Sequence, residues 1–241
     1  GIQLEAVNSD RSVCYELLDV ASVRVTSTGV PLYLKGAQYS KKNTLIMTSS
    51  GTATFERTSK YAVVFLEKAE ETTVVIKNGI YNVKTAVAGL DANAAFRVEG
   101  CAADGMGSQI DFTVEDAVVN VSAAYAPASE TSNNVDLRAL SLVGSSGSTM
   151  KILGDSVVSV TATSSKDSLA VYGVYNSGVA VSVEDTAVLN VTASSTNGEG
   201  YAIYIPENTS GSLTVLDEGS VNLTGTTGAS NSASVPSETE T

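Results

Sequence analysis

Four aspartates recur at equivalent points of a repeating pattern, and their carboxylates are the groups best suited to hold a metal ion. They are Asp116, Asp155, Asp185 and Asp217. Ca²⁺ prefers such hard oxygen ligands, and adjacent carboxylates repel one another unless a cation lies between them. Asp side chains also accept hydrogen bonds from backbone N–H groups in ordinary turns. We predict turns without a cofactor, with calcium binding as the alternative.

A second set of polar residues recurs at regular spacing. The amides are Asn82, Asn120, Asn190 and Asn222, and hydroxyls follow two residues later at Thr161, Thr192 and Thr224. Alternation along a β-strand places both sets on one outer face. Such a ladder could align with a polysaccharide, but stacked Asn and Thr side chains also hydrogen-bond one another. The pattern favours the structural ladder, with glycan binding as the alternative.

Tyrosines form the third candidate group, because an exposed ring can stack on a sugar while its hydroxyl stays in water. They gather beside one apolar run of the repeat, at Tyr33, Tyr61, Tyr172, Tyr175, Tyr201 and Tyr204. Tyr172 and Tyr175 are three residues apart, so alternation predicts that they point to opposite faces. We therefore expect half of the tyrosines to serve in packing, and we keep Tyr175 and Tyr204 as glycan-binding candidates.

Catalytic side chains are scarce. The chain has no His, which excludes the usual Ser-His-Asp triads and most zinc sites. Asp111 and Asp116 could act as an acid–base pair, yet nothing in their spacing selects that role. We predict no catalytic residues and no enzyme, with a polysaccharide lyase or glycoside hydrolase as the alternative.

These residues belong to a repeat of about thirty positions that carries three short apolar runs. Its third run ends at Val25, Phe55, Val83, Val121, Val160, Val191 and Leu223. The runs alternate between apolar and polar residues, which indicates strands and not helices. Three strands per repeat predict one coil of a three-sided solenoid, with equivalent strands stacked about 4.8 Å apart. Residues 1–224 would give about seven coils, and residues 225–241, rich in Ser, Thr and Gly, read as a linker or disordered tail.

The late repeats carry a resemblance to a known family. The units Tyr172–Tyr175 and Tyr201–Tyr204 are each followed by a Val-rich run and then by a run such as Val188–Thr192. This order resembles the repeats of exported, pectate-lyase-like β-helix proteins of Gram-positive gut bacteria, over Leu169–Thr224 most clearly. The resemblance implies an all-β fold, a right-handed parallel β-helix, in an adhesin-like or carbohydrate-binding protein, often attached to the cell wall. Enzymes of that fold use clustered Asp with a basic residue, and here the acidic turns lack a matching Arg or Lys.

Charge and cysteine content narrow the partners and the location. The net charge of −12 argues against nucleic acid and anionic membranes as partners, and no apolar stretch is long enough to span a bilayer. Gly1 in place of Met predicts further upstream sequence, with an export signal as the candidate. Cys14 and Cys101 would lie three rungs apart, about 14 Å, which exceeds the ~7 Å reach of a disulfide. We therefore expect free thiols.

These observations predict a secreted or cell-wall-attached surface module that is not an enzyme. The expected partner is a polysaccharide, or a glycan on a host or bacterial surface. An inert structural stalk is a further alternative, and the sequence leaves the oligomeric state open.

Overall fold

Alternating apolar and polar residues form β-strands throughout the computed structural model. The structure describes residues 1–6, 11–57, 62–87, 94–99, 109–125, 136–165, 170–196 and 198–225. All regular elements within these ranges are strands, arranged in two sheets, and every strand pairing there is parallel. The predicted all-β class is confirmed.

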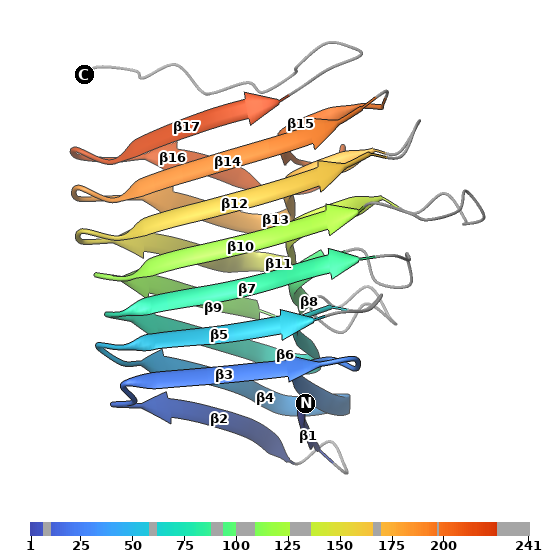
Figure 1. Ribbon diagram of the computed structural model, residues 1–241, viewed down its shortest axis with the longest axis vertical. Helices are drawn as coiled ribbons and strands as arrows, with labels where there is room; N and C mark the ends of the chain where they lie inside the picture. Colours follow the sequence, from blue (N-terminus) through green and yellow to red (C-terminus); the bar gives the residue numbers. More distant parts are fainter. Residues whose placement is uncertain are drawn as a thin grey trace.

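The smaller sheet contains seven strands in the order β17-β14-β12-β10-β7-β5-β3. Its members are β3 (Ser22–Ser27), β5 (Thr52–Arg57), β7 (Ile80–Val87), β10 (Val118–Tyr125), β12 (Val157–Ser164), β14 (Val188–Ser195) and β17 (Ser220–Gly225). Figure 1 shows them stacked from β3 near one end of the molecule to β17 near the other.

The larger sheet contains ten strands and follows the path β1-β4-β6-β8-β11-β13-β15, with β2, β9 and β16 pairing alongside. Its members are β1 (Ile2–Glu5), β2 (Ser12–Leu18), β4 (Leu32–Thr48), β6 (Val64–Lys77), β8 (Ala94–Glu99), β9 (Gln109–Glu115), β11 (Leu137–Leu153), β13 (Val171–Val183), β15 (Gly200–Tyr204) and β16 (Ser212–Val215).

The register of the smaller sheet confirms the repeat read from the sequence. The residues that end the third run are paired one after another, as Val25 with Phe55, Phe55 with Val83, Val83 with Val121, Val121 with Val160, Val160 with Val191 and Val191 with Leu223. Side chains about thirty positions apart are therefore stacked neighbours, as predicted.

The expectation of three separate short strands in every repeat was wrong for four repeats. There the first and second runs form one long strand, β4, β6, β11 or β13, so both runs belong to the larger sheet. The chain changes direction within these strands at irregularities, such as that between Val143 and Ser148, where Gly147 has a φ of 87°. Buried polar groups support the backbone there: the Ser148 hydroxyl accepts a hydrogen bond from Ile110 N at 3.0 Å, and Asn176 Nδ2 donates to Val179 O at 2.9 Å.

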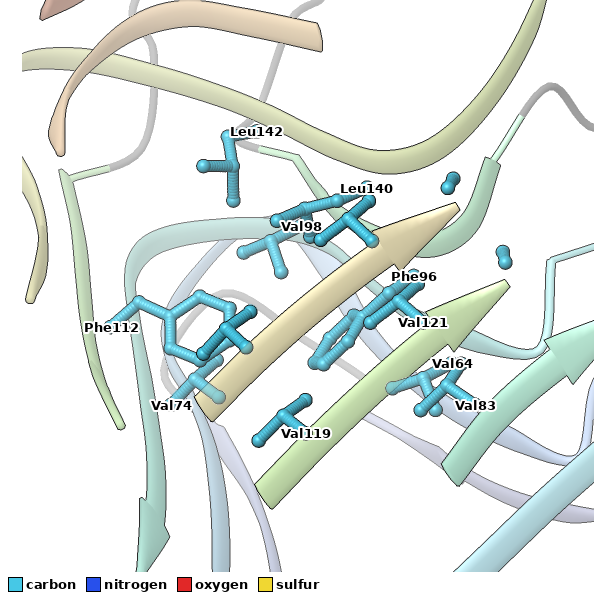
Figure 2. Packing of buried hydrophobic residues seen from close by; sticks show 14 of the residues in the cluster. Val64, Val74, Val83, Phe96, Val98, Phe112, Val119, Val121, Leu140 and Leu142 are labelled. Carbon is cyan, nitrogen blue, oxygen red and sulfur yellow. The ribbon is translucent and has the colours of Figure 1, made fainter. Parts of the chain in front are cut away.

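The inward side chains of both sheets form one apolar core. Along β10, β12 and β14, partly exposed and buried residues alternate at every position, as expected of strands with one face covered. In Figure 2, Phe96 and Phe112 of the larger sheet lie among Val83, Val119 and Val121 of the smaller sheet. The two Phe rings are 5.5 Å apart, a separation that favours aromatic contact. The outward faces of the two sheets are therefore held in fixed positions by a shared interior.

Candidate functional site

The aspartate column occupies turns in which the backbone is left-handed. Asp116, Asp185 and Asp217 have φ angles of 49°, 58° and 56°, and Asp is one of the few non-Gly types enriched there. Asp116 Oδ1 accepts a hydrogen bond from Asp155 N at 3.0 Å, and Asp185 Oδ2 accepts one from Gly154 N at 2.9 Å. These carboxylates thus bind the backbone of an adjacent repeat, which is the turn chemistry expected of them.

The same turns offer little support for a metal ion. Asp155 Oδ1 accepts a hydrogen bond from the Thr186 hydroxyl at 2.6 Å. Among the described residues, no group of three or more His, Cys, Asp or Glu side chains is close enough to hold a metal ion. Calcium binding by Asp116, Asp155, Asp185 and Asp217 remains a prediction.

The asparagine column forms hydrogen bonds within itself. Asn120 Nδ2 donates to Asn82 Oδ1 at 3.0 Å, and Asn222 Nδ2 donates to Asn190 Oδ1 at 2.9 Å. The adjacent hydroxyls lie in register on the same face, at Ser122, Thr161, Thr192 and Thr224. Because these amides satisfy one another across the sheet, the geometry favours the structural ladder over glycan binding.

Four tyrosines form a cluster on the outer face of the larger sheet. Tyr172 and Tyr175 of β13 are in register with Tyr201 and Tyr204 of β15. The ring centres are 5.6 Å apart for Tyr172 and Tyr201, 5.8 Å for Tyr175 and Tyr204, and 4.6 Å for Tyr172 and Tyr204. We call Tyr172, Tyr175, Tyr201 and Tyr204 the tyrosine cluster.

The prediction that Tyr172 and Tyr175 point to opposite faces was wrong. Their rings are in edge-to-face contact, with centres 5.9 Å apart. Between them, Val174 packs in the core, and a Cβ on Gly173 would clash with the inward side chain of Val191. Two consecutive positions thus face inward, and the alternation shifts by one residue, so both tyrosines face outward.

A sequence signal for this shift exists in the equivalent repeats. The position of Gly173 is held by small residues elsewhere, namely Ala95, Ala139 and Ala202, each followed by a large apolar residue of the core or its edge. A small residue next to a large one lets two neighbours fit into the same interior. This recurring pair marks where the strand departs from simple alternation.

Arg138 of β11 completes the cluster. Its guanidinium carbon lies 3.4 Å from the centre of the Tyr175 ring and 5.9 Å from that of Tyr172, which allows a cation–π interaction. The nearest carboxylate is Asp136, with 3.6 Å between Arg138 Nη2 and Asp136 Oδ2. Only 13% of the Arg138 side chain is exposed, so the guanidinium is held largely by aromatic rings.

The surroundings keep two hydroxyls of the cluster protonated. A hydrogen bond to Glu199, with Tyr201 Oη 2.6 Å from Glu199 Oε2, is the main reason that the pKa of Tyr201 rises to about 12. Burial, together with the nearby Asp136 carboxylate, raises the pKa of Tyr172 above its usual range. Both rings therefore stay uncharged well above neutral pH, and the Tyr201 proton is donated to Glu199.

A second aromatic group lies on the same face, towards the N-terminal end of the stack. The rings of Tyr33 and Phe65 are parallel within 2°, with centres 5.0 Å apart, and Arg97 lies 4.8 Å above the Phe65 ring. Glu99 holds Arg97 in place, with 2.6 Å between Arg97 Nε and Glu99 Oε1. Reasoning from the sequence missed Phe65 and Arg97, although positions 33, 65 and 97 are evenly spaced and carry the signal.

The remaining features are a hollow between the sheets and a free thiol. A hollow between the two sheets is lined by aliphatic side chains with Asn176 and Ser212, and none of its lining residues carries a charge. Cys14 is an exposed free thiol, and Cys101 lies outside the described residues. Tyr61 and most of the predicted tail, from residue 226 onward, also lie outside them.

Comparisons with known proteins add no functional assignment. No family model, curated protein or solved structure matches the chain. Within the described part, no helix is long and apolar enough to cross a membrane.

Proposed function

We propose that this chain is a non-catalytic, extracellular surface module: a rigid β-helical rod that binds glycans. The observation that carries the proposal is the tyrosine cluster with Arg138, which gathers four aromatic rings and a guanidinium on one outer face. The partner is a polysaccharide or a glycan on a host or bacterial surface.

The parallel registers support a solenoid as the scaffold. Strands of successive repeats pair in both sheets, as expected when each coil stacks on the previous one. Connections between parallel strands of one sheet are right-handed in about 98% of cases, which favours a right-handed β-helix. Such a stack fixes the tyrosines of β13 and β15 relative to one another, so little conformational entropy would be lost on binding.

The chemistry of the cluster suits sugars better than it suits a purely apolar ligand. Tyrosine provides a broad apolar ring for the C–H face of a sugar and a hydroxyl for its polar groups. Tyr175 and Tyr204 are partly exposed, whereas Tyr172 is 8% exposed and mainly supports the others. Tyr201 is partly exposed too, but its hydroxyl is bonded to Glu199, so Tyr175 and Tyr204, the two residues chosen from the sequence, would make the main contacts.

Location at the cell surface is part of the same proposal. It is supported by the resemblance of the late repeats to exported β-helix proteins and by the acidic composition, which disfavours binding to nucleic acid and anionic membranes. An enzyme is less well supported because Asp116, Asp155 and Asp185 are engaged in turns. An inert stalk would not explain why four tyrosines and Arg138 gather on one face.

Glycan-array screening followed by calorimetric titration tests the proposal. The wild-type chain should bind at least one glycan, and Tyr175→Leu or Tyr204→Leu should weaken binding at least tenfold. Tyr204→Phe, which keeps the ring, should retain most of the affinity. Thr163→Ala, on β12 of the smaller sheet, is the control and should bind like the wild type. Absence of binding by the wild type, or full binding by both Leu variants, would refute the proposal.

A further inference from the structure

We infer that Tyr33, Phe65 and Arg97 form a second glycan subsite, and that one unbranched polysaccharide chain spans both subsites along the stacking direction. This inference rests on the proposed glycan binding by the tyrosine cluster. We call Tyr33, Phe65 and Arg97 the second subsite.

The strand registers place both subsites in one column. Pairing connects Tyr33 to Phe65, Phe65 to Arg97, Arg97 to Ser141, Ser141 to Tyr175 and Tyr175 to Tyr204. Paired residues of a parallel sheet share a face, so these side chains follow one line across six strands. At the usual strand spacing this line is about 24 Å long. A polymer is the ligand whose shape matches such a line.

The second subsite presents the outward edges of two aromatic rings beside charged groups, because Phe65 lies between Tyr33 and Arg97. Phe65 is apolar and partly exposed on an outward face, where a core role does not explain it. Its ring is parallel to that of Tyr33, and Arg97 covers part of it at 4.8 Å. Glu67, which accepts a hydrogen bond from the Tyr33 hydroxyl, and Glu99 flank these rings with carboxylates that can accept hydrogen bonds from sugar hydroxyls.

Unused hydrogen-bonding groups lie where the two subsites meet. Ser141 is fully buried, and its Oγ has no hydrogen-bond partner within the described part of the chain. The same holds for Nε of Arg138, which immediately precedes the small core residue Ala139 and lies over the Tyr175 ring. Buried polar groups are normally paired, so each unpaired one calls for an explanation. A ligand hydroxyl, or a water that the ligand holds in place, would supply the missing partners at this rung.

Two subsites on one rigid face predict a dependence on ligand length. Once one end of a chain is bound, the other end is held close to the second subsite, which raises its effective concentration there. A short oligomer occupies a single subsite and gains nothing from this effect. Affinity should therefore rise steeply once the oligomer is long enough to reach from Tyr204 to Phe65.

Calorimetric titration with oligosaccharide series tests the inference on the full chain. The probes are cello-oligosaccharides, xylo-oligosaccharides and oligogalacturonides, each from the monomer to the longest soluble member. The wild type should bind the longest member of one series at least tenfold more tightly than its short members. Phe65→Leu should abolish this gain with length, and Arg97→Gln, measured alongside in case Phe65→Leu misfolds, should reduce it.

The outcomes separate the inference from the proposed function. If affinity does not depend on length, or if Phe65→Leu and Arg97→Gln keep the full gain, the second subsite is refuted while glycan binding by the tyrosine cluster stands. If neither these series nor an array binds the wild type, both proposals fail. Thr163→Ala, on β12 of the smaller sheet, serves as the control and should show the wild-type length dependence.

Discussion

Arg138 and Tyr175 belong to different strands, and the guanidinium carbon of one lies 3.4 Å from the ring centre of the other. The register pairs Arg138 with Tyr172 and Ser141 with Tyr175. The Arg138 side chain therefore extends past Tyr172, in the direction of the strand, to reach Tyr175. This contact links β11 to β13. The contact therefore contributes both to the packing of the larger sheet and to the shape of the face that we propose for binding.

Replacing Arg138 should therefore weaken both stability and binding. A largely desolvated cation–π contact contributes about 1–2 kcal/mol, so Arg138→Ala should lower the free energy of unfolding by that amount in urea titrations. Lysine cannot reproduce the flat stacking of a guanidinium, so Arg138→Lys should recover only part of the loss. Equal stability of Arg138→Ala and the wild type would show that the contact is energetically neutral.

Gly173 should not tolerate even one added methyl group. A Cβ there would overlap with Val191 Cγ1 and with the carbonyl oxygen of Ala202. We expect Gly173→Ala to destabilise the chain by about 1–3 kcal/mol, as other overpacked cores are, and to weaken glycan binding by displacing Tyr172 and Tyr175. Gly29→Ala is the matched control, because its Cβ would meet only Ser27 Oγ, at 3.7 Å, and should change stability little.

The left-handed turn at Asp116 should depend on the conformational preference of its residue and on its side-chain hydrogen bond together. Asp116→Ala loses the bond to Asp155 N and places a less suitable residue at a φ of 49°, so it should cost about 1–3 kcal/mol in thermal unfolding. Asp116→Asn keeps both features and should be close to neutral. A rise in melting temperature on adding Ca²⁺ but not Mg²⁺, lost in Asp116→Asn, would instead establish a calcium site.

The asparagine ladder should contribute to stability and not to binding. Asn120→Ala removes a donor to Asn82 and should cost about 1 kcal/mol of unfolding free energy. Asn120→Ser should cost less, since the column already contains Ser159. Glycan affinity should be unchanged in both variants. A loss of binding without a loss of stability would place a ligand on the smaller sheet as well.

Alkaline titration should report the pairing of Tyr201 with Glu199. The pKa of Tyr201 rises from the ordinary value of 10 to about 12 in the folded chain. The folded state therefore holds this proton longer than the unfolded state does. Its contribution to stability is complete below pH 10 and is lost as the pH rises towards 12.

The measurement is tyrosinate absorbance together with unfolding at several pH values. Glu199→Gln should lower the pKa of Tyr201, because the hydrogen bond to Glu199 is the main cause of the shift. Tyr201→Phe should remove one titrating group and flatten the fall in stability. An identical absorbance titration in Glu199→Gln would contradict the assignment.

Much of the architecture could be predicted because apolar side chains recur at matching positions of each repeat. The columns through Val83, Val121 and Val191 follow from apolar residues that recur at matching positions, and stacked strands are the only arrangement that buries them all. The merging of two runs into one strand in β11 and β13 could not be predicted. Gly147 and Gly178 have the positive φ angles of turns, but buried Ser148 and Asn176 keep the backbone hydrogen-bonded through the bends.

The candidate site was predicted only in part. Tyr175 and Tyr204 were identified by residue type, but strict alternation misplaced Tyr172, because the inward pair Gly173–Val174 shifts the pattern. Phe65 and Arg97 were missed because each is unremarkable in its own repeat. Their relation becomes visible only when the register aligns them with Tyr33.

The pairing of the smaller sheet runs from β3 to β17 without a register shift. A gene rearrangement that duplicates or removes one whole repeat would therefore leave every column continuous. Rod length could change during evolution in steps of one coil, while β13 and β15 carried the tyrosine cluster unchanged. The distance between that cluster and the second subsite would change by the same step, so recombination could retune which chain lengths the face prefers.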